Sequence, residues 1–260
     1  MKVVILAGGL GTRISEESYL KPKPMIEIGE MPILWHIMKV YSHYGFNEFI
    51  VCAGYKQHYI KEWYADYFMN TSDVTFDYTS ENGSVIYHEK SVEPWKVTIV
   101  NTGLNTQTGG RIKRIQKYVG NEQFMLSYGD GVADINIPNL IDFHKTHNCI
   151  CTLSMYNYGQ HKGVVEVAPD GLIGAFREKA DDDGDLINIG FMVLEPEIFN
   201  YIKGDDTAFE KEPMQQLVRE KKLAGYIHDG YWQCMDTLRE KNQIEQIWNS
   251  GKAPWKVWED

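Results

Sequence analysis

The sequence predicts one α/β domain with a mostly parallel central sheet and a mixed-sheet C-terminal part. Three observations predict this class. The chain of 260 residues is long enough for one large domain and shows no internal repeat or long linker. In its first half, short apolar runs alternate with helical patterns. In its second half, short apolar runs follow one another across a hairpin-like turn.

The first half is expected to alternate strands and helices. Residues 3–7 (VVILA) form a short continuous apolar run, which is typical of a central parallel strand. Residues 32–45 are expected to form a helix, because Pro32 suits a first helical turn, apolar residues recur at helical spacing, and Gly45 can end the helix. The other elements expected here are a strand at 49–53, a helix at 56–69, a hairpin of strands 76–78 and 85–87 around Asn82-Gly83, a strand at 97–100, a helix at 112–119 and a strand at 124–127.

The second half is expected to be more antiparallel. Pro169-Asp170-Gly171 is a turn sequence between two short apolar runs, which predicts a hairpin. The elements expected here are strands at 150–155, 164–167, 172–176 and 189–194, and helices at 209–221 and 237–250. This half therefore supplies the mixed-sheet part.

Composition and charge argue against several functions. The net charge is −10, and an acidic chain lacks the basic surface of a general nucleic-acid binder, so an anionic ligand needs locally placed cations or a metal ion. No run of 18 or more apolar residues occurs, so no membrane span is expected. The apolar N-terminus lacks a signal-peptide cleavage site, and we expect a cytoplasmic protein. The cysteines, which lack a second Cys or His pair at zinc-ligand spacing, are expected to be core thiols: Cys52, Cys149, Cys151 and Cys234.

A glycine-rich segment, LAGGLGTR at residues 6–13, directly follows the first strand. Parallel sheets bind ligands at this end of a strand, and glycines let backbone N–H groups approach phosphates closely. Arg13 adds a forked cation that suits phosphate oxygens. The segment is not a Walker A motif, and Ile14 stands where a dinucleotide fingerprint requires a third small residue. A tight turn that merely needs glycine is the alternative.

Two lysine–proline pairs follow at residues 21–24, before Met25. The prolines hold the backbone extended, so a lysine in this segment is a positioned cation. Such a cation suits the charge that develops on a transferring phosphoryl group. Taken alone, a segment of this kind is more often a surface loop.

Together, LAGGLGTR and KPKPM resemble the N-terminal signature of the sugar-1-phosphate nucleotidyltransferase family. The resemblance covers the whole chain and implies a single Rossmann-like nucleotidyltransferase domain, with a nucleotide-binding part at about 1–135 and a sugar-phosphate-binding and C-terminal part at about 136–260. It is closest to the glucose-1-phosphate cytidylyltransferases, on residues 15–17, 32–38, 92–98, 101–103, 108–114 and 251–258. It implies CTP as donor, α-D-glucose 1-phosphate as acceptor, and CDP-glucose and pyrophosphate as products.

The resemblance also implies which residues meet the nucleotide. Arg13 and Lys23 would be the catalytic cations, at the leaving pyrophosphate and at the α-phosphate respectively. Lys23 matches better than Lys21, because Pro24 and Met25 follow it. Thr108-Gly109-Gly110-Arg111 is a small-residue turn that could admit a phosphate or a base edge, with a plain loop before a helix as the alternative. The implied nucleotide-binding set is Leu6, Ala7, Gly8, Gly9, Gly11, Thr12, Arg13, Lys23, Thr108, Arg111, Gly129 and Asp130.

Two aspartates are candidates for binding Mg²⁺. Asp130 follows an apolar strand and is flanked by glycines that leave room for a ligand, and Asp236 follows an aromatic run. Few protein carboxylates, completed by water and phosphate oxygens, suit Mg²⁺. Either aspartate alone could be a turn former or an N-cap, but the resemblance implies that both bind the metal. Asp134 is a weaker candidate for a nearby role.

The resemblance implies an acceptor pocket made by Glu166, Glu178, Lys179, Asn188 and Gly190. Lys179 would hold the sugar phosphate. Glu166 and Asn188 would meet sugar hydroxyls, and Gly190 would permit their close approach. The sequence departs from the family pattern at Lys162 and Ala180, which leaves another phosphorylated acceptor as an alternative.

The implied reaction is a direct in-line displacement, which needs positioning and charge neutralisation but no strong base. Three other functions are alternatives: a uridylyl- or thymidylyltransferase of the same family, a non-catalytic binding subunit, and a nicotinamide-dependent oxidoreductase. The implied partners are the two small-molecule substrates and further copies of the chain, with no nucleic acid or membrane. The tryptophan-bearing segments 92–98 and 252–258 could lie in an interface or in the core. A CDP-sugar would supply surface polysaccharide such as O-antigen, by resemblance alone.

Overall fold

The computed structural model describes residues 1–79, 81–88, 92–157, 164–167, 171–177 and 186–259. Its central sheet has eight strands: β1 (Lys2–Ala7), β4 (Glu48–Ala53), β7 (Lys96–Asn101), β8 (Phe124–Tyr128), β10 (Cys151–Asn157), β13 (Leu186–Asn188), β14 (Met192–Leu194) and β15 (Leu223–Ile227). The order is β13-β10-β14-β8-β1-β4-β7, and β15 pairs with β10. The neighbours β8, β1, β4 and β7 are parallel, whereas β14 is antiparallel to β8 and to β10. The expected sheet, mostly parallel with a mixed C-terminal part, is confirmed.

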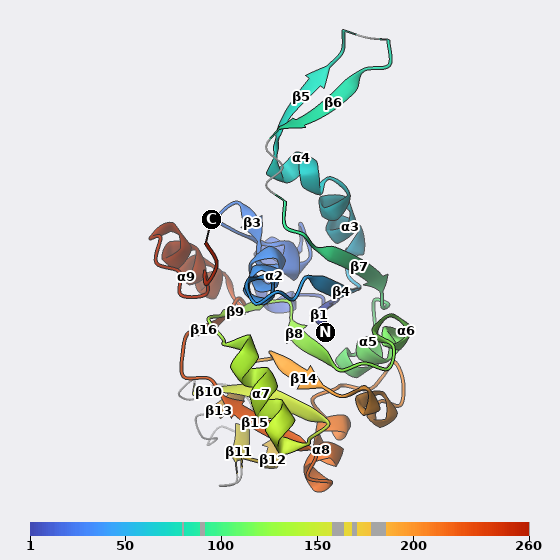
Figure 1. Cartoon of the computed structure of the whole chain (residues 1–260), viewed down its shortest axis with the longest axis vertical. Coiled ribbons are helices and arrows are strands. Elements are labelled where there is room, and N and C mark those ends of the chain that lie inside the picture. The colour runs from blue at the N-terminus through green and yellow to red at the C-terminus, as the bar shows by residue number, and fades with distance from the viewer. Residues whose placement is uncertain (80, 89–91, 158–163, 168–170, 178–185, 260) are drawn as a thin grey trace.

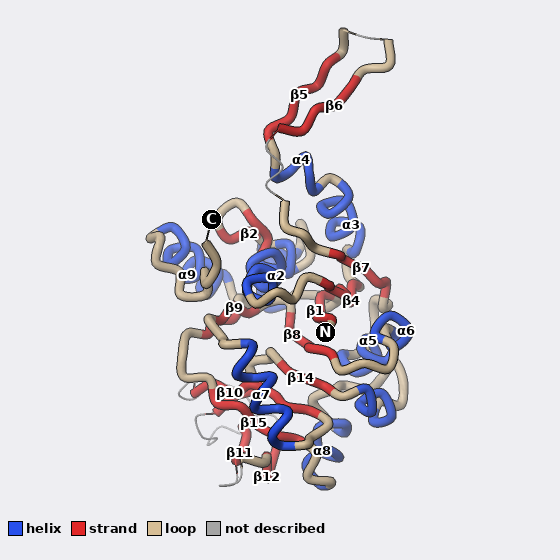
Figure 2. The backbone as a smooth tube through the Cα atoms, viewed as in Figure 1, coloured by secondary structure: helices blue, strands red, loops and turns tan. Residues whose placement is uncertain are grey.

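Short two-stranded sheets and helices surround this sheet (Figure 1). The strand pairs are β2 (Glu27–Ile28) with β3 (Met31–Pro32), β5 (Asp73–Asp77) with β6 (Ser84–His88), β9 (Gly131–Ala133) with β16 (Trp232–Cys234), and β11 (Val164–Val167) with β12 (Ile173–Arg177). The α-helices are α1 (Ser15–Ser18), α2 (Ile33–His43), α3 (Gln57–Ala65), α4 (Tyr67–Thr71), α5 (Thr108–Arg114), α6 (Gln116–Val119), α7 (Ile137–His147), α8 (Glu212–Arg219) and α9 (Leu238–Asn249). The 3₁₀ helices are η1 (Thr12–Ile14), η2 (Lys23–Met25) and η3 (Pro196–Tyr201). The β5–β6 hairpin projects beyond α4, away from the central sheet (Figure 2).

The core has one layer on each face of the sheet. Successive side chains of β1 point to opposite faces, so Val3 and Ile5 join one buried cluster, which includes residues of α2 and α9. Val4 and Leu6 join the other cluster, which includes residues of α5 and α8. A strand that is buried on both faces reads as a continuous apolar run, which is why residues 3–7 lack polar alternation.

Several expected elements differ in detail. The helix expected at 56–69 is interrupted at Asp66, between α3 and α4. The strand expected at 189–194 is confined to β14, because Gly190 (φ 78°) and Phe191 (φ 48°) are left-handed and separate it from β13. The segment considered as a turn at 108–111 is the first turn of α5. Helix α7 and the pair β9–β16 were not expected.

The tryptophans of the two segments considered as interface or core pack against the core of this chain, and Trp95 is only partly buried. Trp255 and Trp258 are buried in the cluster with α2, and Trp95 packs against Trp35 and Phe49. The four cysteines are also buried, as expected. Within the described ranges, no helix combines the length and apolarity that a membrane crossing requires.

Candidate active site

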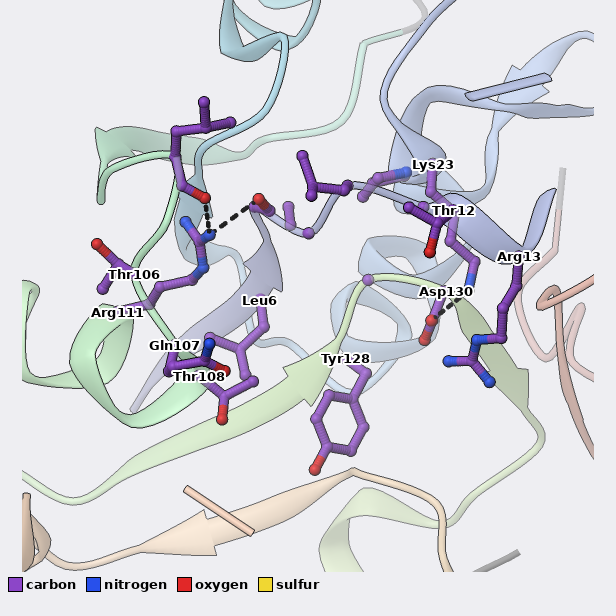
Figure 3. A pocket seen from close by; sticks show the side chains of 18 of the residues that line it. Leu6, Thr12, Arg13, Lys23, Thr106, Gln107, Thr108, Arg111, Tyr128 and Asp130 are labelled. Atoms are coloured by element: carbon purple, nitrogen blue, oxygen red, sulfur yellow. Dashed lines mark hydrogen bonds and ion pairs between the residues drawn. The ribbon is translucent and has the colours of Figure 1, made fainter. Parts of the chain in front are cut away.

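A cavity of about 580 Å³ lies at the carboxyl ends of β1 and β8. Every residue expected to bind the nucleotide lines it, together with Asp236. The other lining residues are Leu10, Ile14, Pro24, Leu104, Asn105, Thr106, Gln107 and Tyr128. The structure therefore brings the glycine-rich loop, Lys23 and the start of α5 to one place (Figure 3).

Arg111 ties the loop after β1 to the loop after β7. Its Nη2 donates to the carbonyl oxygens of Gly8 (2.9 Å) and Leu104 (3.2 Å). Its Nη1 donates to the Thr102 hydroxyl (2.8 Å) and the Gly103 carbonyl (2.7 Å). Burial lowers the pKa of Arg111, but an arginine stays protonated in a protein. Both terminal nitrogens thus hold backbone in place, a role that the sequence did not predict.

This arrangement explains one glycine of the loop. A Cβ atom at Gly8 would lie 2.1 Å from Nη1 of Arg111. Because four hydrogen bonds fix the guanidinium, it cannot move aside easily. Glycine at position 8 is therefore required by the protein itself, before any ligand binds.

Four charged side chains form a cluster at the other end of the cavity. Lys23 Nζ lies 2.6 Å from Asp130 Oδ2 and 2.7 Å from Asp236 Oδ1. Arg13 Nη1 lies 2.5 Å from Asp236 Oδ2. Burial lowers the pKa of Lys23, but the charges of the two carboxylates and their hydrogen bonds outweigh it, so this pKa is raised above its usual value. The Lys23 ammonium is therefore firmly protonated.

Backbone pairing brings the two aspartates together. Asp130 lies between β8 and β9, and Asp236 follows β16. Strands β9 and β16 pair with Cys234 opposite Gly131, and Met235 N donates to the Asp130 carbonyl at 2.8 Å. Asp236 N also donates to Glu240 Oε2 (2.9 Å), at the start of α9. The two carboxylates are thus held by three elements.

The two carboxylates fit a single hard divalent cation. Both reach the same ammonium nitrogen, so both can serve one cation. No group of three or more His, Cys, Asp or Glu side chains suited to a metal occurs in the described part of the chain. Two carboxylates are few for a metal held by protein alone, but Mg²⁺ in nucleotide enzymes takes its other ligands from phosphates and water.

Asp134 is engaged elsewhere. Its Oδ1 accepts a hydrogen bond from Tyr231 N at 2.6 Å and lies 3.1 Å from His228 Nε2. It does not line the cavity. Asp134 therefore secures the segment before β16 and does not join the carboxylate pair.

The expected acceptor residues are only partly described. Glu178 and Lys179 lie outside the described residues, as do Lys162 and Ala180. Glu166 lies in β11, where it pairs with Ala175 of β12.

Asn188 and Gly190 meet the cavity wall at Tyr128. Asn188 Nδ2 donates to the Tyr128 hydroxyl at 3.2 Å, and Gly190 N donates to Asn188 Oδ1 at 3.0 Å. A Cβ atom at Gly190 would lie 2.9 Å from Cδ2 of Tyr128. This contact and the left-handed φ of 78° explain why the protein itself needs glycine at position 190. The sequence analysis had instead attributed this glycine to the close approach of a sugar.

Tyr128 and Glu210 were missed by the sequence analysis. Tyr128 lines the cavity, and its hydroxyl donates to Glu210 Oε1 at 2.9 Å. Burial, and then the charge of Glu210, raise the pKa of Tyr128 well above its usual value, so the hydroxyl stays protonated. Tyr128 lies two residues before Asp130, at the end of β8, so its position could have identified it as a site residue. Glu210 comes from a loop without a motif, and no local pattern could have found it.

The chain matches the model of the nucleotidyl transferase family over residues 2–253. It is 51% identical over 260 residues to the glucose-1-phosphate cytidylyltransferases of Salmonella typhimurium and Salmonella typhi, covering 100% of each chain. Among solved structures it is similar to HddC from Yersinia pseudotuberculosis, with a TM-score of 0.75, 22% identity, and coverage of 95% of this chain and 99% of that chain. It is also similar to a UDP-glucose pyrophosphorylase complexed with UDP-glucose, with a TM-score of 0.75, 17% identity, and coverage of 96% and 98%. At these identities the two structures share the fold.

Proposed function

The chain belongs to the nucleotidyl transferase family, and on that premise we propose that it transfers the cytidylyl group of CTP to α-D-glucose 1-phosphate. The products are CDP-glucose and pyrophosphate. The observation that carries the type of reaction is the cavity beyond β1, where a glycine-rich loop, two cations and two carboxylates meet. The choice of CTP and glucose 1-phosphate is supported by the 51% identity to two relatives that are named glucose-1-phosphate cytidylyltransferases.

The proposed chemistry is one in-line displacement. A phosphate oxygen of glucose 1-phosphate forms a bond to the α-phosphorus of CTP. The bond from that phosphorus to the oxygen bridging to the β-phosphate breaks, and its electron pair leaves with pyrophosphate. A phosphate monoester is largely ionised near neutral pH, so the protein need not supply a base. Catalysis then depends on alignment and charge neutralisation.

The two cations suit different phosphates. Only 11% of the Lys23 side chain is exposed, so Lys23 is a fixed charge, and we assign it to the α-phosphate. The Arg13 side chain is 71% exposed and comes from the short helix η1, so it can follow the leaving pyrophosphate outward. Backbone N–H groups of the loop at Gly8, Gly9 and Gly11 would meet the remaining phosphate oxygens.

We further propose that Asp130 and Asp236 hold Mg²⁺. The bound ion would offset phosphate charge and help to align donor and acceptor. The support is the convergence of the two carboxylates on one point, now held by the Lys23 ammonium. On the acceptor side, Asn188 and Gly190 would meet the sugar together with Glu166, and Glu178 and Lys179 would complete that pocket.

The chain is also proposed to form a homo-oligomer. Apolar side chains on the projecting β5–β6 hairpin support this, since Val85 and Ile86 are nearly half exposed and Phe76 is 45% exposed. Such side chains favour a covered surface. Sedimentation velocity tests this proposal, and a monomer at micromolar concentration would contradict it.

We also propose a cytoplasmic location and a supply of CDP-glucose to surface polysaccharide, on the basis of the proposed reaction.

Pyrophosphate release tests the proposed reaction. The purified protein is mixed with Mg²⁺, glucose 1-phosphate and CTP, UTP, dTTP, ATP or GTP in turn. We expect release with CTP alone. Release with UTP or dTTP instead of CTP would favour a uridylyl- or thymidylyltransferase of the same family. If CTP releases pyrophosphate only when glucose 1-phosphate is replaced by another phosphorylated compound, that compound is the better candidate for the acceptor. Nucleotide binding without release under any of these conditions would identify a binding protein and overturn the enzymatic proposal.

A further inference from the structure

The carboxylate of Glu210 joins two walls of the cavity. Glu210 lies in the loop before α8, and each of its oxygens accepts one hydrogen bond. Oε2 accepts from the Thr108 hydroxyl at 2.6 Å, and Oε1 accepts from the Tyr128 hydroxyl at 2.9 Å. Thr108 begins α5, whereas Tyr128 ends β8, and both line the cavity (Figure 3). One side chain thus spans two separate elements.

The direction of these hydrogen bonds is fixed. An ionised carboxylate can only accept, so the Tyr128 hydroxyl must give its single hydrogen to Glu210. The hydroxyl oxygen can then accept from Asn188 Nδ2, which lies 3.2 Å away. On its other side, the Asn188 amide accepts from Gly190 N at 3.0 Å. The amide therefore has one orientation, with nitrogen toward Tyr128 and oxygen toward Gly190.

Thr108 is fixed in the same manner. Its hydroxyl donates to Glu210 and accepts from Phe209 N at 2.8 Å. The loop that carries Glu210 is thus bound to the first turn of α5. The ring of Tyr128 lies so close to the backbone of Gly190 that a Cβ atom at this position would lie 2.9 Å from Cδ2 of the ring. Each group in the chain from Thr108 to Asn188 is held at both ends.

We propose that Glu210 is a positioning residue for the acceptor. Through the Tyr128 hydroxyl it orients the Asn188 amide, and through Thr108 it links that orientation to the nucleotide side of the cavity. The inference rests on the proposed function, in which Asn188 meets the sugar. A misoriented amide would present the wrong group to a sugar hydroxyl, so the network affects acceptor binding more than chemistry.

The decisive variant is Tyr128→Phe, which keeps the ring and removes only the hydroxyl. The KM for glucose 1-phosphate should rise about tenfold, the size of one lost hydrogen bond, while the KM for CTP and kcat stay within about twofold. The matched control is Tyr201→Phe. Tyr201 also donates to a glutamate, Glu220, at 2.5 Å, but on the surface and away from the cavity. This control should change none of the three constants.

Two substitutions at Glu210 separate positioning from general structure. Glu210→Ala releases both partners and should raise the KM for glucose 1-phosphate about tenfold. Glu210→Gln keeps a carbonyl oxygen for Tyr128, and its NH₂ group can donate to the Thr108 hydroxyl oxygen, so the KM should return to within about threefold of wild type. Because Tyr128 and Glu210 act through the same amide, the double variant Tyr128→Phe/Glu210→Ala should be no worse for the acceptor than either single variant.

Three results would overturn the inference. The first is an unchanged KM for glucose 1-phosphate in Tyr128→Phe. The second is multiplication of the two effects in the double variant, and the third is a loss with Glu210→Gln as large as with Glu210→Ala. If Glu210→Ala fails to fold in a thermal melt, Tyr128→Phe and Glu210→Gln decide alone. A wild-type protein that releases no pyrophosphate from CTP and glucose 1-phosphate would instead refute the proposed function, and this inference with it.

Discussion

Replacing Lys23 with Met removes one positive charge from between two carboxylates and keeps most of the side-chain volume. The ammonium lies 2.6 Å from Asp130 Oδ2 and 2.7 Å from Asp236 Oδ1, and only 11% of the Lys23 side chain is exposed. Removing one partner of a buried ion pair costs about 3–5 kcal/mol of unfolding free energy. We expect a loss of about 3 kcal/mol, because Asp236 keeps Arg13 and the Asp130 side chain is 32% exposed.

The Lys23→Met variant should also bind Mg²⁺ more tightly than the wild type when no nucleotide is present. In the wild type, Lys23 already neutralises the carboxylates that we assign to the metal. If the variant binds Mg²⁺ with a Kd of about 0.1 mM, about 10 mM of the ion restores roughly 2.7 kcal/mol of stability. The wild type should gain less than about 1 kcal/mol, because the ion must first displace an ammonium.

The pKa of Lys23 sets the pH range for this comparison. This pKa lies above the usual 10.5, because interactions with the two carboxylates outweigh the effect of burial. A raised lysine pKa contributes stability that is fully present below 10.5 and is lost only as pH rises through the folded-state value. The stabilising effect of the ammonium is therefore constant between about pH 6 and about pH 9.

Urea unfolding with and without Mg²⁺ measures both effects. Lys21→Met is the matched control, because Lys21 pairs with Glu27 at 2.7 Å on the surface and its loss should cost at most about 1 kcal/mol. Equal stabilisation of the wild type and Lys23→Met by Mg²⁺ would show that lysine and metal do not share the carboxylates. Turnover of Lys23→Met should fall at least about a hundredfold, and near-normal turnover would remove Lys23 from the mechanism.

Three further changes test other parts of the site and the core. Asp130→Asn should lower turnover at least about a hundredfold in the pyrophosphate assay, and unchanged turnover would argue against its metal role. Gly8→Ala should lower stability by about 1–3 kcal/mol, since its Cβ would meet Arg111, and an unchanged urea midpoint would contradict this packing. Burial lowers the pKa of His36 to about 4, although a ring nitrogen contacts the Ile28 carbonyl. As pH falls below 6.5, His36 therefore takes up a proton in the unfolded chain before it does so in the folded protein. Stability should therefore fall by roughly 3 kcal/mol between pH 6.5 and pH 4, and His36→Gln should flatten that slope; equal slopes would exclude His36 as its source.

The part of the site that sequence predicted best is the part carried by short segments. Residues 6–13 with Lys23 line one cavity, because a loop after a central strand must emerge at one edge of the sheet. The meeting of Asp130 and Asp236 depends on the pairing of β9 with β16. These strands have three residues each, too few to show a period. The proximity of the two aspartates was therefore implied only by the resemblance.

For the fold too, elements marked by a local sequence pattern were predicted, whereas features that depend on tertiary contacts were not. The helices α2 and α9 were predicted from helical spacing, and the strands β1, β4, β7 and β8 from short apolar runs, whereas α7 and the parallel strand β15 were not predicted. The expected strand at 189–194 contains two left-handed residues, and one of them, Phe191, carries no sequence signal for that conformation. The partners of Glu210 depend on tertiary contacts alone, since Thr108 and Tyr128 lie far from it in the chain.

The charges in the cavity bear on how an acidic chain can bind two anions. The chain carries a net charge of −10, and among the residues that the structure describes, the charged side chains lining the cavity are Arg13, Lys23, Arg111, Asp130 and Asp236. They leave one net positive charge, and the terminal nitrogens of Arg111 are already bound to protein oxygens. A nucleoside triphosphate carries more negative charge than these described side chains offset, and a divalent cation that arrives with it would supply further positive charge. Asp130 and Asp236, once they bind a divalent cation, would release Lys23 and Arg13 to the phosphates. The ion pairs are then a resting state that keeps both cations beside the place where the substrate needs them.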